Sequence, residues 1–296
     1  MIKTYLNLTK PGIIFGNVIT TAAGFALASK GHFNFGLFLA TLLGISLIIA
    51  SACVFNNYID RVADEKMIRT KNRALVKGSV SIRSAILFGI FLGLLGIFTL
   101  SYYTNLLTVL VAFTGFFVYV VLYSNLKYRS IYGTLVGSVA GAIPPVVGYC
   151  AVSHIFDTGA FILFLLIALW QMPHFFAIAM YRFDDYAAAS IPVLPIIKGV
   201  HTTKIHMLLY IIAFTLTSLM LTVLGYTGYG YLAITGLASL TWLVLCIKGF
   251  TIGDDKLWAR SMFRFSLIVV IALSAMIAVD VVKDPKTSVI ALMQDT

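Results

Sequence analysis

Three oxygen-bearing side chains follow one another at intervals of four residues: Asn56, Asp60 and Asp64. On a helix this spacing places all three on one face, within reach of one another. They stand at the end of an apolar segment, where ionisable groups are costly enough to indicate a function. Carboxylate and amide oxygens suit Mg²⁺, which proteins commonly share with the phosphates of a substrate. We therefore expect Asn56, Asp60 and Asp64 to bind Mg²⁺, with the two aspartates catalytic.

A basic stretch follows this acidic helix end and supplies the opposite charge. Lys and Arg side chains are the usual partners of phosphate oxygens. The alternative interpretation is a solvated helix end whose acids pair with neighbouring arginines, and the spacing alone leaves both open. On the first interpretation the expected substrate-binding residues are Asn57, Arg69, Lys71, Arg73 and Lys77.

A second acidic pair, Asp184 and Asp185, lies beside Arg182 and upstream of Lys198. Two acid-bearing helix ends that are far apart in sequence would suit opposite walls of one metal site. Asp185 is accordingly expected to bind the metal and act in catalysis, and Arg182 and Lys198 to contact the substrate. An ordinary interfacial turn, with charges that only set topology, is the alternative.

A third group combines aromatic and basic side chains: Tyr119, Tyr123, Lys127 and Arg129. Lys127, which we place in catalysis, and Arg129 can reach a diphosphate, and the tyrosine faces can line an apolar or cationic intermediate. A tyrosine-rich interfacial belt with a pair of topology-setting cations remains the alternative.

A histidine inside an apolar segment, His174, follows Pro173, which predicts a kinked or loosened helix. A histidine at this depth is costly. It is expected either to contact a metalloporphyrin or phosphate or to pack against a partner hydroxyl.

Composition places these groups in a membrane protein. The chain has 296 residues, of which 60% are hydrophobic and 11% charged, and its mean hydropathy is +0.98. Soluble domains carry about 25% charged residues. This chain carries far fewer, so its composition is not that of a soluble domain. Nine apolar runs are long enough to span a bilayer as helices. They cover residues 11–29, 36–58, 83–102, 106–125, 131–152, 159–181, 206–225, 231–249 and 261–281.

Charge asymmetry predicts the orientation. Eighteen of the 21 Lys and Arg residues fall on one side of these spans, which the positive-inside rule makes cytoplasmic. The N-terminus is then inside, and the acidic groups face the cytoplasm. The net charge of +10 reflects these loops rather than nucleic-acid binding. With no cleavage signal before the first span, we expect one multi-pass domain over residues 1–296 in a bacterial inner membrane.

These motifs resemble those of a known family. The pattern Asn56-Asn57-Tyr58-Ile59-Asp60-x-x-x-Asp64 with Arg69-Thr70-x-x-Arg73 resembles the first motif of the UbiA superfamily of intramembrane aromatic prenyltransferases. The likeness extends over nearly the whole chain and is strongest to the branch that farnesylates haem. The segments similar to that branch are residues 53–61, 73–78, 141–149, 170–174 and 191–195.

The resemblance implies an all-α bundle of nine transmembrane helices, with a central cavity open to the cytoplasm and to lipid. It implies farnesyl diphosphate and haem B as substrates, Mg²⁺ as cofactor, and haem O and diphosphate as products. A haem A synthase or a terminal oxidase would receive haem O. The chain departs from the wider superfamily in having Asn57 in place of an aspartate and Ala189 four residues after Asp185. One of two Mg²⁺ ions is then weak or absent.

Two other functions remain open from sequence. A prenyltransferase acting on a quinone-precursor ring would differ only in its acceptor pocket. A secondary transporter would show inverted repeats and ionisable groups near mid-membrane, whereas the acids here cluster at one rim.

Overall fold

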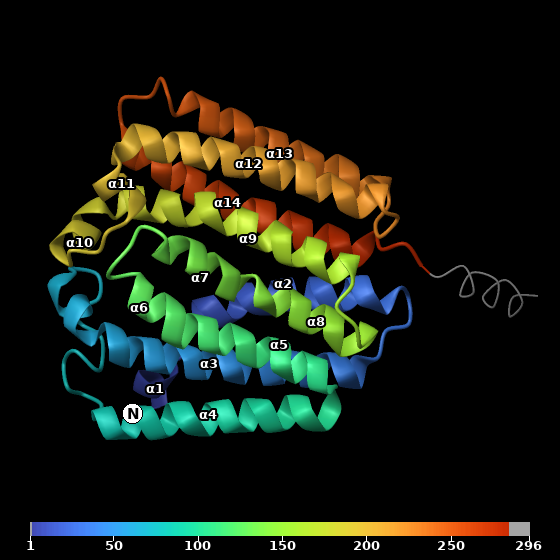
Figure 1. Ribbon diagram of the computed structural model, residues 1–296, viewed down its shortest axis with the longest axis horizontal. Coiled ribbons are helices and arrows are strands. Elements are labelled where there is room, and N and C mark those ends of the chain that lie inside the picture. Colours follow the sequence, from blue (N-terminus) through green and yellow to red (C-terminus); the bar gives the residue numbers. More distant parts are fainter. Residues whose placement is uncertain (1, 284–296) are drawn as a thin grey trace, which may run out of the picture.

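Long helices run side by side through the whole molecule (Figure 1). The computed structural model describes residues 2–283. The elements are α1 (Ile2–Leu8), α2 (Pro11–Ser29), α3 (Phe35–Lys66), α4 (Ile82–Tyr103), α5 (Leu106–Phe117), η1 (Val118–Tyr123), α6 (Ser124–Leu126), α7 (Gly133–Gly141), α8 (Ile143–Ser153), α9 (Thr158–Tyr181), α10 (Phe183–Ala188), α11 (Leu194–Ile197), α12 (Gly199–Val223), α13 (Tyr229–Lys248) and α14 (Asp255–Val279). Within the described residues, nine helical stretches are long and apolar enough to cross a membrane. The protein is therefore a multi-pass, all-α membrane protein, as the sequence predicts.

Three helices extend beyond their apolar runs at the end that carries the charged loops. α3 continues to Lys66 instead of ending near residue 58, and α12 and α14 begin before residues 206 and 261. Polar partners explain the added turns of α12 and α14, because Lys204 is buried with its Nζ donating to the Gly249 carbonyl (2.6 Å) and pairing with the Asp255 carboxylate. Helices can extend where such pairing offsets the cost of burying charge.

The fifth span, predicted over residues 131–152, is the helical stretch Gly133–Ser153, and a break divides it into two helices. α7 ends at Gly141 and α8 begins at Ile143, directly before Pro144 and Pro145. A proline lacks the backbone N–H and clashes with the preceding turn, so consecutive prolines fit the start of a new helix. α8 packs closely against α2, because a Cβ at Gly24 would overlap the Pro145 backbone.

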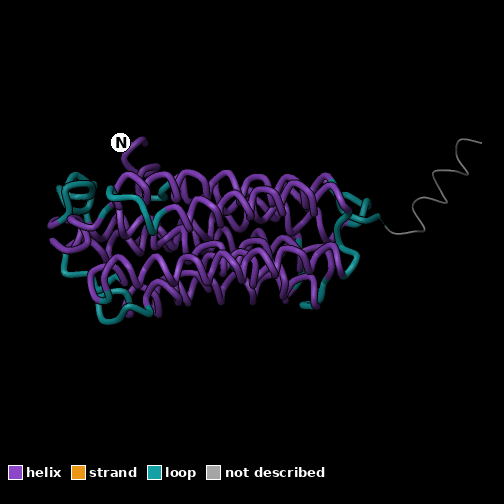
Figure 2. The backbone as a smooth tube through the Cα atoms, turned by 90° about the horizontal axis from the view of Figure 1, so that it is seen from above, coloured by secondary structure: helices purple, strands orange, loops and turns teal. Residues whose placement is uncertain are grey.

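The two ends of the bundle differ in the loops that they carry. One end, called the polar end here, bears residues 67–81, 127–132 and 182–198, and α1 lies nearer to it (Figure 1). Figure 2 shows the start of the described chain at the end with the larger loops. The opposite end has short connections, where the side chain of Lys283 lies beside Gly31.

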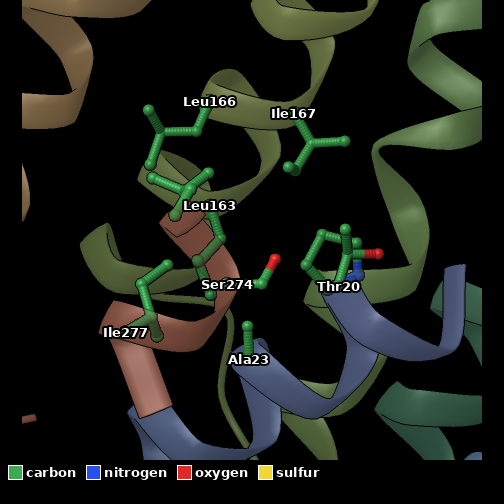
Figure 3. Close-up of a pocket in the computed structure, with 9 residues that line it drawn as sticks. Thr20, Ala23, Leu163, Leu166, Ile167, Ser274 and Ile277 are labelled. Carbon is green, nitrogen blue, oxygen red and sulfur yellow. The ribbon is translucent and has the colours of Figure 1, made fainter. Parts of the chain in front are cut away.

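Most of the interior is tightly packed. Figure 3 shows a small void among α2, α8, α9 and α14, where Thr20, Ala23, Leu163 and Ile277 meet. Its volume is about 10 Å³, which is no more than the space one water molecule needs. This void is too small to be a ligand site.

Candidate active site

A cavity of about 890 Å³ lies between α2, α3, α5, η1, α7, α9 and α14 and reaches the loops of the polar end. Along α3 it is lined from Ile45 to Asp64, a rise of about 28 Å at 1.5 Å per residue. Its deep wall is apolar. Five cations and two carboxylates line it, a net charge of +3, so the cavity suits an anion with a long apolar tail. The charged residues are Lys10, Asp60, Asp64, Arg69, Arg73, Lys127 and Arg182.

The carboxylate of Asp60 is held from outside α3 through one of its two oxygens. Lys127 Nζ and the Tyr128 hydroxyl (2.8 Å) both donate to Asp60 Oδ1. Burial lowers the pKa of Lys127, and the Asp60 charge opposes that shift. Burial and then Asp60 raise the pKa of Tyr128, which keeps its hydroxyl a neutral donor. Asp60 lines the cavity, and its Oδ2 has no hydrogen-bond partner among the described residues.

Asp64 follows one helical turn later, and one of its two carboxylate oxygens is likewise held by a basic side chain. Arg73 Nη1 donates to Asp64 Oδ2 (2.6 Å), and the Thr70 hydroxyl donates to the Asp64 backbone carbonyl (3.0 Å). These two bonds fold residues 67–81 back onto the end of α3. Asp64 is 1% exposed, and its Oδ1 has no partner within the described chain. The two aspartates thus each leave one carboxylate oxygen free on the same face.

The free oxygens fit a magnesium ion that shares its ligands with a substrate. No group of three or more His, Cys, Asp and Glu side chains that could hold a metal occurs in residues 2–283. Mg²⁺ is commonly held by only one or two carboxylates, with phosphate oxygens and water completing its shell. Asp60 and Asp64 meet that requirement, and the surrounding cations match a diphosphate.

Lys10, which the sequence analysis missed, completes the cationic wall. Its Nζ donates to Asn56 Oδ1 (2.6 Å) and it lines the cavity. Its backbone is left-handed (φ 52°), which turns the chain between α1 and α2. Burial lowers the pKa of Lys10 to about 8. The signal in sequence is a lysine directly before Pro11 and the first span, but a topology-setting charge has the same pattern.

The two asparagines of the motif do different things. Asn56 lines the cavity beside Asp60, and its Nδ2 lies 3.5 Å from the Ser124 hydroxyl. Asn57 does not line the cavity, because its Nδ2 donates to the Leu8 carbonyl (2.8 Å) and ties α1 to α3. We therefore place Asn57 among structural contacts rather than with the substrate.

A turn of π-helix, η1, positions the aromatic and basic group. Tyr119 and Tyr123 stack with ring centroids 5.3 Å apart, and Lys127 Nζ lies 5.0 Å from the Tyr123 ring centre. α7 approaches this segment closely, since a Cβ at Gly137 would lie 3.0 Å from the Tyr123 ring and one at Gly133 2.6 Å from Lys127 Cα. Such single π turns often occur at functional sites.

The second acidic group reaches the polar end but not the cavity. Asp185 Oδ1 accepts a hydrogen bond from the Ile68 backbone N–H (3.0 Å), so it anchors residues 67–81. Asp185 is not among the residues that line the cavity with Asp60 and Asp64. Asp184 pairs with Lys256 (3.1 Å) at an exposed position. Of the basic residues expected to bind substrate, Arg69, Arg73 and Arg182 line the cavity. The others lie outside its wall: Lys71, Lys77, Arg129 and Lys198.

The position of His174 agrees in part with both predictions, a packing role and a contact with the substrate. Its Nδ1 lies 2.7 Å from the Ser266 hydroxyl on α14, as a packing histidine would, yet the ring also lines the cavity. Trp170 stacks on the imidazole with centroids 4.8 Å apart. α9 runs unbroken through Pro173.

Comparison with known proteins identifies the family. The sequence profile of the UbiA prenyltransferase family matches residues 17–268. A protein named protoheme IX farnesyltransferase from Protochlamydia amoebophila is 56% identical over 282 residues, covering 95% of this chain and all of that protein. The structure of a digeranylgeranylglyceryl phosphate synthase has a TM-score of 0.76 at 18% identity, covering 94% of this chain and 98% of the other.

A UbiA homologue from Archaeoglobus fulgidus bound to GPP and Mg²⁺ has a TM-score of 0.70 at 16% identity. The likeness covers 93% of this chain and 99% of that one. At this identity it supports the fold alone. The profile match and the high identity to the Protochlamydia protein establish that the chain belongs to the UbiA prenyltransferase family.

Proposed function

We propose that this chain transfers a farnesyl group from farnesyl diphosphate to a vinyl group of haem B, giving haem O and diphosphate. The observation that carries the proposal is the pair of free oxygens on Asp60 and Asp64, set among cations at the mouth of a long apolar cavity. The 56% identity to a named protoheme IX farnesyltransferase supports haem B as the acceptor.

The anionic head of the donor binds at the polar end. Lys10, Arg73 and Lys127 each carry a positive charge into the cavity wall and pair with diphosphate oxygens. Arg73 and Lys127 are held in place by the same aspartates that offer their second oxygen to a metal. The farnesyl tail lies along the apolar wall of α3 and α5, where Ile48 and Phe116 line the cavity.

Asp60 and Asp64 are the proposed magnesium ligands, with Asn56 beside them. Bound Mg²⁺ supplies charge neutralisation for the diphosphate as it leaves. The cations on both sides of the aspartates stabilise the same developing charge, and they need little reorganisation because they are already fixed. The free oxygens on this chain support the metal, and the Mg²⁺-bound homologue gives a precedent.

The allylic C–O bond breaks, and its electron pair leaves with the diphosphate. The π electrons of the vinyl group form the new C–C bond to the farnesyl carbon. Water then adds to the cation left beside the porphyrin ring and loses a proton, giving a hydroxyethylfarnesyl side chain. The stacked rings of Tyr119 and Tyr123 face the cavity and can stabilise the allylic cation, while the apolar walls limit capture by bulk water.

The polar end is proposed to face the cytoplasm of a bacterium. The basic loops gather at this end, which is the orientation that the positive-inside rule favours. Bacterial relatives support an inner-membrane location.

Reconstitution tests the proposal directly. The purified chain in detergent is supplied with farnesyl diphosphate, haem B and Mg²⁺, and the extracted haems are analysed by mass spectrometry. We expect haem O to appear only when all components are present. Prenylation of a quinone-precursor ring with no conversion of haem B would reject the proposed acceptor. Absence of prenyl transfer to any acceptor would reject the reaction.

A further inference from the structure

The imidazole of His174 is fixed in one tautomer. The Ser266 hydroxyl lies 2.6 Å from the Phe263 carbonyl, to which it must donate its only hydrogen. It can therefore only accept from His174, whose Nδ1 is 2.7 Å away. Nδ1 thus carries the proton, and Nε2 keeps its lone pair.

That lone pair is not used within the protein. Nε2 has no hydrogen-bond partner in the described part of the chain, and the His174 ring lines the cavity. Metal-bound histidines characteristically donate their other ring N–H to a fixed partner, which holds the ring and makes the ligating nitrogen more basic. Histidine is also the commonest protein ligand of haem iron.

The walls around His174 suit a flat macrocycle. Trp170, Phe175 and Phe263 pack around the imidazole, with ring centroids 4.8, 5.6 and 5.0 Å from it. All three side chains face the same cavity, on its α9 and α14 side. The carboxylates Asp60 and Asp64 lie on a different helix, α3, so the acceptor and the diphosphate have separate walls.

A second polar group, on the residue that directly follows α9, lacks a partner. Arg182 Nε is fully buried and has no hydrogen-bond partner among the described residues, although Arg182 lines the cavity. A buried donor left unpaired is costly, and a ligand acceptor would satisfy it. Arg182 lies eight residues after His174, about 12 Å further toward the polar end. Haem carries its iron at the centre and two carboxylates at one edge, which matches an imidazole at depth and a guanidinium nearer the rim.

We propose that α9 is the haem-docking wall, with His174 Nε2 as an axial ligand of the haem iron and Arg182 as the partner of a propionate. This inference rests on the proposed function. Ser266 is then a positioning residue, because it acts by fixing the His174 tautomer.

The test compares haem B with metal-free protoporphyrin IX, which has the same carboxylates and no iron. Affinities and absorption spectra are measured on the purified full chain in detergent. His174→Ala should weaken ferric haem about 100-fold and leave metal-free porphyrin unchanged, while Ser266→Ala should weaken haem by about 10-fold. Arg182→Gln should weaken both porphyrins alike, by about 10-fold or more.

An absorption spectrum distinguishes a His174 that binds the haem iron from a His174 that only packs in the protein. Ferric haem on the unaltered chain should show a histidine-ligated spectrum that His174→Gly loses and added imidazole restores. Equal loss of both porphyrins in His174→Ala, or an unchanged spectrum, would overturn the axial role and make His174 a packing residue or a base. Unchanged porphyrin affinity in Arg182→Gln would remove the propionate contact. If the unaltered chain binds neither porphyrin, the proposed function itself fails, whereas binding without these differences rejects only the haem-docking wall.

Discussion

Replacing Asp60 with asparagine isolates the charge that we place at the centre of the reaction. Asparagine keeps an oxygen that accepts from Lys127 and Tyr128, so the local packing is retained. It removes the negative charge and turns the free Oδ2 position into an amide donor, which cannot bind Mg²⁺. The perturbation is therefore electrostatic rather than steric.

Its magnitude follows from two opposing effects. A unit charge interacting with another about 4 Å away contributes about 4 kcal/mol at an effective dielectric of 20. Lys127, released from its ion pair, gains freedom to bind the diphosphate and offsets part of that loss. The net cost should be about 2.7–4 kcal/mol, a fall of about 10²–10³-fold in kcat, as for removal of one preorganised electrostatic group.

The assay is the initial rate of haem O formation, with farnesyl diphosphate, haem B and Mg²⁺ saturating. Asp184→Asn is the matched control, because its carboxylate is 81% exposed and pairs only with Lys256. We expect the control to retain nearly full activity. A kcat for Asp60→Asn within about threefold of the unaltered chain would refute the metal assignment. An equal fall in both variants would refute it as well.

Three further predictions follow from other contacts. Because burial lowers the pKa of Lys10 to about 8, its positive charge is present below that pH and lost above it. The kcat/KM for farnesyl diphosphate should thus fall as pH rises through about 8, and Lys10→Arg should move the fall to higher pH; identical profiles would exclude Lys10 from substrate binding. Excess chelator should stop haem O formation and added Mg²⁺ should restore it, whereas full activity in chelator would remove the metal from the mechanism. Gly24→Ala should lower the apparent Tm by about 2–12 °C, since its Cβ overlaps the Pro145 backbone at a cost of about 1–3 kcal/mol. Gly236→Ala, whose Cβ meets open space, is its control, and equal Tm values would contradict the close packing of α2 on α8.

The nine spans could be predicted from sequence because apolar run length is nearly sufficient to define a membrane helix. Their ends could not, because they depend on contacts between distant segments. α3 continues past residue 58 because Asp60 finds Lys127 and Asp64 finds Arg73. The pairing of Asp60 with Lys127 links residues 67 positions apart, and no local pattern contains it.

The sequence identifies the two cavity-lining acids of the candidate site, but only some of its basic residues. The four-residue spacing is sufficient to place Asp60 and Asp64 together on any helix. Lys10 was missed because its role depends on a left-handed residue that turns the side chain inward. The sequence predicts that Asp185 lies at the same membrane face as Asp60 and Asp64, but its bond to the Ile68 N–H and its place outside the cavity wall depend on loop contacts that no local pattern contains.

The wide turn at Val118–Tyr123 has a consequence for how this helix can vary. Each residue of an ordinary α-helix rotates the chain by about 100°. A wide turn takes up one extra residue without that rotation, so deleting one residue from it would restore regular winding while the segment after it, with Lys127, keeps its facing. A deletion in the regular helical turns before Lys127 would instead rotate Lys127 away from Asp60, so this wide turn is the place where the helix best tolerates the loss of a residue.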